Sequence, residues 1–266
     1  MPRRPRSILH RHPTPQAQNP ATFPMHPVFP IVSLDTCFRR NNLTFPTSFF
    51  VSPVSKLNPA NYPPLDKPPP TDSPEVLQWI QEVQQSGVTI PNISTTVTGG
   101  CPANPSEAAD PSRCWWTCGG CTRPADVSNC PAQYSWGLTY DDGPAPPTSS
   151  LLDYLDQVNL RATMFIIGSR AISEPTVLQR EYVTGHQIAV HTWSHTALTT
   201  QTTEQIIAEI GWTKKVIFDI LGVNPIVARP PYGDIECVFP SFVLACCEID
   251  DYCHHLATAC VLFSLP

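Results

Sequence analysis

A regular alternation of strand-like and helix-like segments constrains this chain more than any other feature. Between residues 134 and 233, short runs rich in β-branched and aromatic residues alternate with longer segments whose apolar residues recur at helical spacing. Such alternation predicts parallel strands joined by helical crossovers, and therefore an α/β sheet or barrel. In these folds the reacting groups gather at the carboxyl ends of the strands. The strand-like runs are YSWGLTYDD, RATMFIIG, HQIAVHTW and PIVARPPYG, and the helix-like segments are TSSLLDYLDQV, EPTVLQREYVTG and TTEQIIAEIGWTKKVIFDILG.

The rest of the 266-residue chain differs in composition from this segment. Residues 1–74 are rich in proline and lack a sustained helical or strand period, so we expect them to be disordered or loosely attached. A helix should follow, with Ser73 as N-cap and Pro74 in the first turn, and a cysteine-rich loop comes after it. The expected divisions are 1–74, a helix and cysteine-rich lead-in at 75–133, an α/β domain at 134–235 and an atypical cysteine-rich tail at 236–266.

Charge and hydropathy argue against two broad classes of protein. The formal net charge is −6, whereas a nucleic-acid-binding protein normally presents a basic face. No apolar run reaches the ~18 residues that a membrane-spanning helix needs, so we expect no transmembrane segment.

The cysteines and glycosylation motifs favour an oxidising compartment, and hence an extracellular or cell-wall location. Two sequons, Asn42-Leu43-Thr44 and Asn92-Ile93-Ser94, are acceptor sites for glycans. The basic start of the chain is followed by no apolar signal region, which favours the interpretation that this N-terminus is not the natural one. We expect disulfides, of unknown pairing, among the five cysteines crowded before the α/β segment, namely Cys101, Cys114, Cys118, Cys121 and Cys130.

Three of the strand-like runs end in residues that suit metal chemistry. The i, i+4 spacing in HTWSH predicts two imidazoles on one side of a helical turn. Two imidazoles and a carboxylate from another strand end make a three-ligand site that leaves a position open for water on zinc or a similar divalent ion. One aspartate of an adjacent pair can then be a ligand while the other accepts a proton from that water. The residues concerned are Asp141 and Asp142, His191 and His195, and Arg229 and Tyr232.

Each motif also has an ordinary alternative explanation. A pair of histidines at this spacing is often unrelated to metal binding, and Asp-Asp-Gly-Pro is usually a turn. The run RPPYG can be a strand that leaves through a rigid turn. Their occurrence at the ends of strands in one α/β pattern favours the metal site. A peptidase is less favoured, because no glutamate accompanies the histidines as in HExxH.

The order and wording of the motifs resemble the NodB-homology polysaccharide deacetylases, carbohydrate esterase family 4, and fungal chitin deacetylases in particular. The resemblance covers about residues 100–235 and rests on TYDDGP, HTWSHT and RPPYGD, with support from the cysteine-rich lead-in and RATMFIIGS. It implies a distorted (β/α) barrel, here incomplete. It also implies a metal-dependent hydrolase that removes N-acetyl groups from chitin or N-acetylglucosamine oligomers, giving chitosan and acetate. The implied cofactor is a divalent metal, zinc in the first place and cobalt as an alternative.

The resemblance implies a role for individual residues as well. Asp141 matches the catalytic base, and Arg229 matches the arginine that holds this base in position. Tyr232 matches a groove tyrosine whose backbone N–H helps to stabilise the oxyanion. We expect Trp193 and Tyr232 to line the floor of a substrate groove. The implied metal ligands are Asp142, His191 and His195.

After Asp234 the resemblance ends. The family continues with a tryptophan-containing motif and a leucine-x-histidine motif that carries the general acid, and the tail shows neither. One alternative has His254 and His255 as replacement acids, or with Cys246, Cys247 and Cys253 as a second metal site. The favoured interpretation is a tail translated from an altered frame or an unspliced segment. We therefore expect an impaired enzyme, because the loss of general-acid help costs about 10²–10⁴-fold in rate. A non-catalytic protein that binds metal and chitin, or a degraded fragment, is the alternative.

Overall fold

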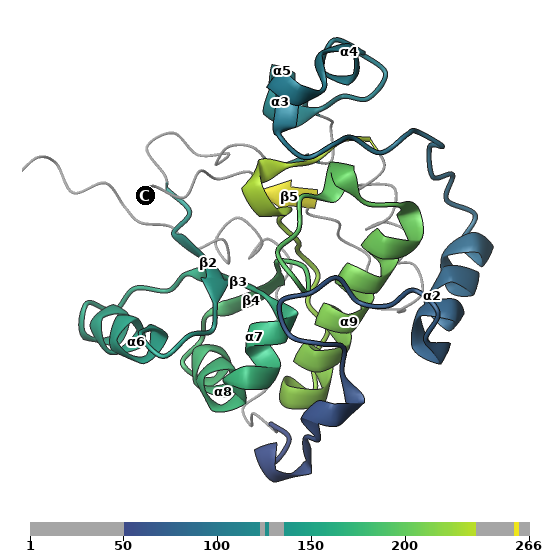
Figure 1. Cartoon of the computed structure of the whole chain (residues 1–266). Helices are drawn as coiled ribbons and strands as arrows, with labels where there is room; N and C mark the ends of the chain where they lie inside the picture. Colours follow the sequence, from purple (N-terminus) through teal and green to yellow (C-terminus); the bar gives the residue numbers. More distant parts are fainter. Residues whose placement is uncertain (1–50, 123–125, 128–135, 238–257, 261–266) are drawn as a thin grey trace, which may run out of the picture.

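A three-stranded parallel sheet forms the centre of the molecule (Figure 1). The computed structural model describes residues 51–122, 126–127, 136–237 and 258–260. The strand order is β2-β3-β4, with β2 at Thr139–Gly143, β3 at Thr163–Ile166 and β4 at Gln187–Val190. Thr163 pairs with Thr139 on one side and with Gln187 on the other, so all the carboxyl ends lie at the same edge of the sheet. The α/β architecture expected from the alternating pattern is confirmed, as an incomplete barrel.

Helices cross between the strands, as the pattern predicts. Helix α6 (Thr148–Gln157) follows β2, α7 (Gly168–Ser173) and α8 (Pro175–Val183) follow β3, and α9 (Thr203–Leu221) follows β4. The side chain of Thr202 accepts from the N–H of Gln205, and the side-chain oxygen of Gln205 accepts from the N–H of Thr202. These two hydrogen bonds form a capping box at the start of α9. The short helix α7 was not expected from the sequence, because a single turn gives no periodic signal.

The core lies around α9, which packs against α2, α7, α8 and β4. Trp193 has no exposed surface; it stacks on Tyr62 at 6.3 Å between ring centroids and meets the edge of Trp212 at 6.4 Å. Gly168 makes room for it, since a Cβ there would lie 2.5 Å from Cε3 of Trp193. A glycine at the start of α7 is therefore a packing requirement.

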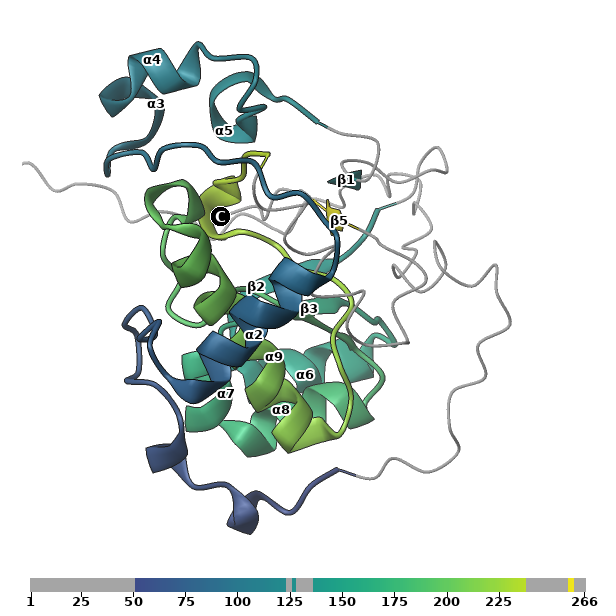
Figure 2. The ribbon, with the colours of Figure 1, turned by 90° about the vertical axis from the view of Figure 1, so that its right-hand side faces the viewer.

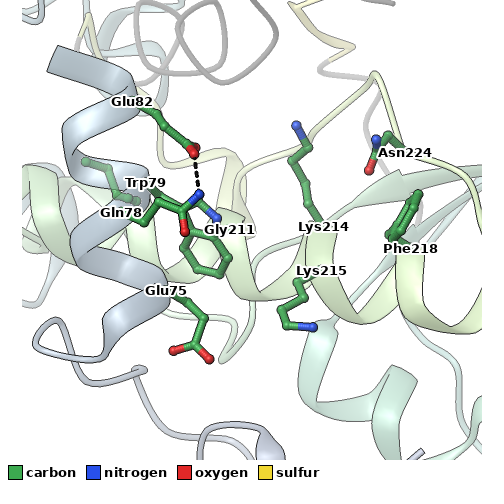
Figure 3. A pocket seen from close by; sticks show the side chains of 10 residues that line it. Glu75, Gln78, Trp79, Glu82, Gly211, Lys214, Lys215, Phe218 and Asn224 are labelled. Atoms are coloured by element: carbon green, nitrogen blue, oxygen red, sulfur yellow. Dashed lines mark hydrogen bonds between the residues drawn. The ribbon is translucent and has the colours of Figure 1, made fainter. Parts of the chain in front are cut away.

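Helix α2 (Pro74–Gln85) lies across the outside of α9 (Figure 2). Ser73 accepts from the N–H of Val76, which confirms the predicted N-cap. Trp79 covers Gly211, where a Cβ would lie 2.3 Å from Cε3 of the indole. A pocket of about 370 Å³ lies between the two helices, with Glu75 of α2 and Lys215 of α9 among its lining residues (Figure 3). It contains none of the residues predicted to form the functional site.

The expectation of disorder is wrong for residues 51–74 and lies outside the described residues for 1–50. The segment includes η2 (Val54–Lys56) and η3 (Pro59–Asn61) and packs on the domain. The Tyr62 hydroxyl donates to Asp219 at 2.7 Å, and the Trp193 indole N–H donates to the carbonyl of Pro64 at 3.0 Å. A proline-rich chain of this kind is ordered by contacts with the core and not by a period of its own.

The fourth predicted strand is much shorter than expected. The run PIVARPPYG contributes one isolated parallel bridge, in which Ala228 pairs with Val190 of β4. The N–H of Val190 donates to Val227 at 2.8 Å, and the N–H of Arg229 donates to Val190 at 2.9 Å. Prolines on both sides of this bridge lack an N–H and cannot extend the ladder.

Three short helices form the cysteine-rich lead-in, α3 (Gly100–Ala103), α4 (Pro105–Ala108) and α5 (Trp116–Gly119). Disulfides join Cys101 to Cys118 and Cys114 to Cys121, which confirms the expectation for four of the five cysteines. Cys130 lies outside the described residues. A two-residue strand, β1 (Asp126–Val127), pairs in parallel with β5 (Thr258–Cys260). None of the helices in the described parts of the chain is both long and apolar enough to cross a membrane.

Candidate metal centre

Three of the predicted residues meet at the carboxyl edge of the sheet. Oδ1 of Asp142 lies 3.3 Å from Nε2 of His191 and 3.0 Å from Nε2 of His195. One ligand atom from each residue lies within 4.8 Å of the other two. Ligands about 2.1 Å from a tetrahedral ion are about 3.4 Å apart, so this set fits one divalent cation with little adjustment. Asp142 comes from β2, whereas both histidines come from the chain that follows β4.

The bend that carries the histidines is not the helical turn that the spacing predicts. Residues 191–196 form an irregular bend, in which Thr192 and His195 have positive φ values of 66° and 58°. The buried carboxylate of Glu209, on α9, accepts from the N–H of Trp193 at 2.7 Å and from the N–H of Ser194 at 2.8 Å. Burial raises the pKa of Glu209, and these hydrogen bonds oppose that effect. The rings thus face one carboxylate because α9 holds the bend.

Hydrogen bonds at the far nitrogens of the two rings orient the near nitrogens. Nδ1 of His191 lies 2.8 Å from the carbonyl of Arg229, which can only accept, so Nδ1 carries the proton and Nε2 offers its lone pair. Nδ1 of His195 lies 3.2 Å from the hydroxyl of Tyr232. When no ion is bound, hydrogen bonds donated by the protonated Nε2 atoms of His191 and His195 hold the pKa of Asp142 well below its usual range, and a bound ion would take the place of those protons. The Asp142 carboxylate is therefore ionised at every pH at which a metal would bind.

The neighbouring Asp141 has a different partner. Nη1 of Arg229 lies 2.5 Å from Oδ1 of Asp141 and 3.1 Å from the hydroxyl of Thr139. The guanidinium lies over the ring of Phe165, 3.9 Å from its centroid, and is buried. The adjacent carboxylates thus avoid competing for one cation, since Asp142 faces the imidazoles while Asp141 faces an arginine fixed by stacking.

The two aromatic residues expected in the substrate groove lie in different environments. Tyr232, in η5 (Pro231–Gly233), is 69% exposed, and its ring lies 4.7 Å from that of His195. The expectation for Trp193 is wrong, because a fully buried indole offers no face to a substrate. In an irregular bend the residue between the histidines points into the core.

Two residues of the site were not identified from the sequence. Glu209 holds the histidine bend, and Arg170 of α7 donates from Nη1 to the carbonyl of Asp142. Glu209 did leave a signal, since it is an acidic residue on the apolar face of α9, where an unpaired charge would be costly. Arg170 has no comparable signal.

A set of one aspartate and two histidines at the carboxyl edge of parallel strands, with a second carboxylate beside it, is typical of mononuclear metal hydrolases. Residues 128–239 match the family model described as polysaccharide deacetylase. This segment is therefore similar in sequence to the polysaccharide deacetylase family.

Named relatives extend the similarity beyond that segment. Chitin deacetylase 1 of Cryptococcus neoformans var. grubii is 53% identical over 186 residues, which are 70% of this chain and 39% of the relative. Chitin deacetylase of Amylomyces rouxii is 46% identical over 137 residues, 49% of this chain and 32% of the relative. A solved family 4 carbohydrate esterase from Streptomyces lividans, in complex with acetate, is 37% identical with a TM-score of 0.40 and covers 41% of this chain and 56% of its own. The chain thus spans well under half the length of the two chitin deacetylases.

Proposed function

We propose that this chain carries the metal-binding half of a chitin deacetylase site, which hydrolyses the N-acetyl groups of chitin or N-acetylglucosamine oligomers and yields chitosan and acetate. The observation that carries the proposal is the division of labour within the aspartate pair. Asp142 faces two imidazoles and Asp141 faces a buried arginine, as ligand and base would. Relatives named chitin deacetylase support the choice of substrate.

Asp142, His191 and His195 would hold the metal, for which we propose zinc with cobalt as the alternative. Their ligand atoms lie together at the strand ends, with Asp142 exposed, His195 partly buried and His191 buried, and carboxylate and imidazole are ligands that zinc accepts. When bound, the ion supplies Lewis acidity and lowers the pKa of a bound water. The proton on Nδ1 of His191, directed at the carbonyl of Arg229, keeps Nε2 available as the ligand atom.

The remaining groups would act on the substrate itself. Asp141 would accept the proton of the attacking water through a carboxylate oxygen, and Arg229 would keep that carboxylate oriented. The backbone N–H of Tyr232 donates to the carbonyl oxygen as negative charge develops on it. The amine that leaves must gain a proton, and no described residue is assigned as its donor.

The chain organisation we propose follows the expected divisions, with a partial deacetylase domain at 134–235 preceded by a disulfide-linked lead-in within 75–133. The two disulfides favour an extracellular or cell-wall location. Asn92, in one of the two sequons, is exposed and accessible to a glycan.

The roles of the aspartates can be tested by substitution. Asp142→Asn and His195→Ala should lose stoichiometric zinc, measured by metal analysis after dialysis. Asp141→Asn should keep zinc but lose acetate release from N-acetylglucosamine oligomers. Asp153→Asn is the matched control, because this aspartate is exposed on α6 and pairs only with Arg180 among the residues described.

Two outcomes would contradict the assignment. If Asp141→Asn weakens zinc binding as much as Asp142→Asn does, the roles are shared or reversed. If the parent chain binds zinc and retains oligomers but releases no acetate, the chain is a non-catalytic binding protein.

A further inference from the structure

An open pocket of about 470 Å³ lies directly beside the metal centre. One side is formed by His195, the residues that follow it, and Tyr232. The opposite side is formed by the lead-in, which contributes Val97 to Gly100 and Thr117. The volume lies within the ~300–1,000 Å³ typical of sites for small ligands. Half of this pocket therefore comes from outside residues 128–239, the part that matches the family model.

The lining of this pocket suits a neutral ligand that is rich in hydroxyl groups. Threonine side chains and glycine backbone groups line it, Thr98 and Gly99 among them. The hydroxyls of Thr117, Thr199 and Thr200 donate to groups of the protein and keep their lone pairs for the hydroxyl groups of a ligand. The lining carboxylate is Asp234, and it is already engaged, since Oδ1 accepts from the indole of Trp115 at 2.8 Å and Oδ2 accepts from the N–H of Thr199 at 3.0 Å. Among the described residues no lysine or arginine lines the pocket, so the lining itself is not built for an anionic ligand.

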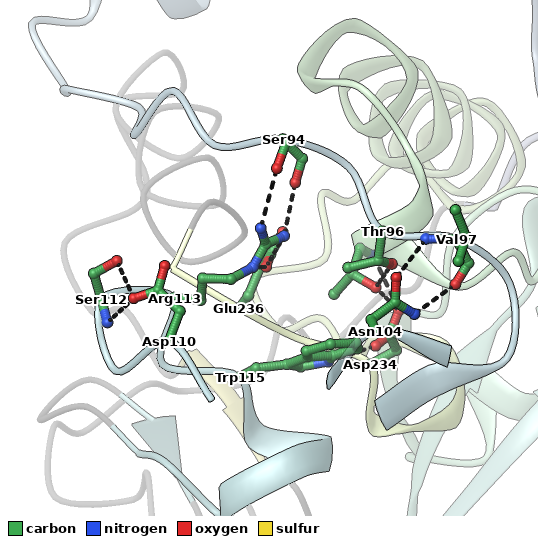
Figure 4. A network of polar contacts seen from close by, with 11 residues as sticks. Ser94, Thr96, Val97, Asn104, Asp110, Ser112, Arg113, Trp115, Asp234 and Glu236 are labelled. Carbon is green, nitrogen blue, oxygen red and sulfur yellow. Dashed lines mark hydrogen bonds and ion pairs between the residues drawn. The ribbon is translucent and has the colours of Figure 1, made fainter. Parts of the chain in front are cut away.

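The lead-in is fixed to the loop that carries Tyr232 (Figure 4). Besides the bond from Trp115 to Asp234, the N–H of Trp116 donates to the carbonyl of Ile235 at 3.0 Å. The hydroxyl of Thr117 donates to the carbonyl of Gly233 at 2.9 Å. These bonds hold the three residues that follow Tyr232.

A buried ion pair anchors the outer part of the lead-in. Nη2 of Arg113 lies 2.7 Å from Oε2 of Glu236 and donates to the carbonyl of Ser94 at 2.7 Å. The guanidinium thus joins the segment before the pocket wall to the chain that follows the third motif (Figure 4). Rigid support of this kind is what a recognition surface requires.

A disulfide closes the wall covalently. Cys101 follows the glycines at the pocket rim, and Cys118 follows Thr117, so the bond between them joins the two stretches of the lead-in that line the pocket. The wall therefore cannot open without breaking this bond or the contacts to residues 233–236.

We propose that the disulfide-linked segment 94–121 is the wall of a substrate subsite, and that its pocket binds the N-acetylglucosamine unit next to the one that reacts. This inference rests on the proposed function. The lead-in then determines the affinity for longer oligomers, while the metal ligands determine the reaction. Val97 and Tyr232 offer exposed apolar surface to the faces of a sugar ring, and the threonine hydroxyls bond its rim.

The test uses the whole chain loaded with zinc and the N-acetylglucosamine pentamer as the probe. Thr98→Trp places a large side chain in the pocket. Thr95→Trp is the matched control, because Thr95 is exposed in the same segment but does not line the pocket. Thr98→Trp should raise the Kd for the pentamer by about tenfold or more, with the zinc Kd unchanged, whereas Thr95→Trp should change neither value. The Cys101→Ser/Cys118→Ser pair should also raise the pentamer Kd and leave the zinc Kd as it is.

The outcomes separate the subsite from the proposed function. Equal pentamer affinity in the parent and Thr98→Trp, with acetate still released by the parent, would overturn the subsite and leave the proposed function standing. A parent chain that neither binds nor deacetylates the pentamer would overturn both.

Discussion

Glu181 offers a test of how burial controls charge directly behind the aspartate pair. It lies on α8, is 1% exposed, and its Oε2 has no hydrogen-bond partner among the described residues. Oε1 lies against β2, since a Cβ built on Gly143 would be 3.6 Å from it. Burial raises the pKa of this carboxyl from 4.5 to about 8. The folded protein therefore holds a neutral glutamic acid next to the strand that ends in two carboxylates.

The sign of the effect on stability follows from linkage. Because the folded state binds the proton more tightly than the unfolded chain does, the contribution is fully present below about pH 4.5 and is lost as the pH rises through about 8. At 1.36 kcal/mol for each pKa unit, the whole contribution is on the order of 5 kcal/mol, of which about 4 kcal/mol would be lost between about pH 5 and pH 8.5. A loss of that size is large against a total stability of about 5–15 kcal/mol.

Glu181→Gln removes the titrating group while keeping nearly the same shape. The free energy of unfolding would be measured by urea titration of tryptophan fluorescence at both pH values, with metal chelated and disulfides intact. The difference in stability between Glu181→Gln and the parent should shift in favour of the variant by up to about 4 kcal/mol on going from the lower to the higher pH. Glu204→Gln is the control, because it makes the same exchange at an exposed position in the first turn of α9 and removes no buried carboxyl. Parallel pH profiles for the parent and Glu181→Gln would refute the reasoning.

Two further predictions concern packing and the lead-in. Gly168→Ala should lower stability by about 1–3 kcal/mol in urea titrations, because the added methyl would lie 2.5 Å from Trp193 and 2.8 Å from Thr213. Gly119→Ala should change stability little, because a Cβ there meets nothing within 4 Å. Equal effects of the two substitutions would contradict the packing argument. Peptide mapping of the non-reduced protein should find Cys101 joined to Cys118 and Cys114 joined to Cys121, and reduction of the 17-residue link should cost about 3 kcal/mol; other pairings among these four cysteines would show that the lead-in folds differently.

The sheet and the positions of the site motifs could be predicted from the sequence because both depend on local patterns. Alternating strand-like and helix-like runs identify β2, β3 and β4, and parallel connection then brings Asp142 and His191 to one edge. The capping residue Ser73 marks a helix start that the structure confirms. Each of these features is specified by a few residues that are neighbours in the sequence.

What the sequence did not predict depends on contacts between distant residues. The bend at residues 191–196 takes its shape from Glu209, so the histidine spacing alone pointed to the wrong local structure. For the same reason Trp193 was assigned to the groove when it belongs to the core. The order of residues 51–74 likewise comes from Tyr62 stacking on that tryptophan, a contact between segments about 130 residues apart.

The way Glu209 holds the histidine bend bears on the order in which the protein folds and acquires its ion. The N–H groups of Trp193 and Ser194 donate to the Glu209 carboxylate on α9, and these hydrogen bonds set the bend. They involve none of the metal-ligand atoms. Many small metal sites form only when the ion draws the chain together, and removal of the ion unfolds them. Here the bend that carries both histidines is held by a buried carboxylate of another helix. We therefore expect the bend to survive chelation, so that metal analysis should find a chelated sample reloaded with zinc without a refolding step.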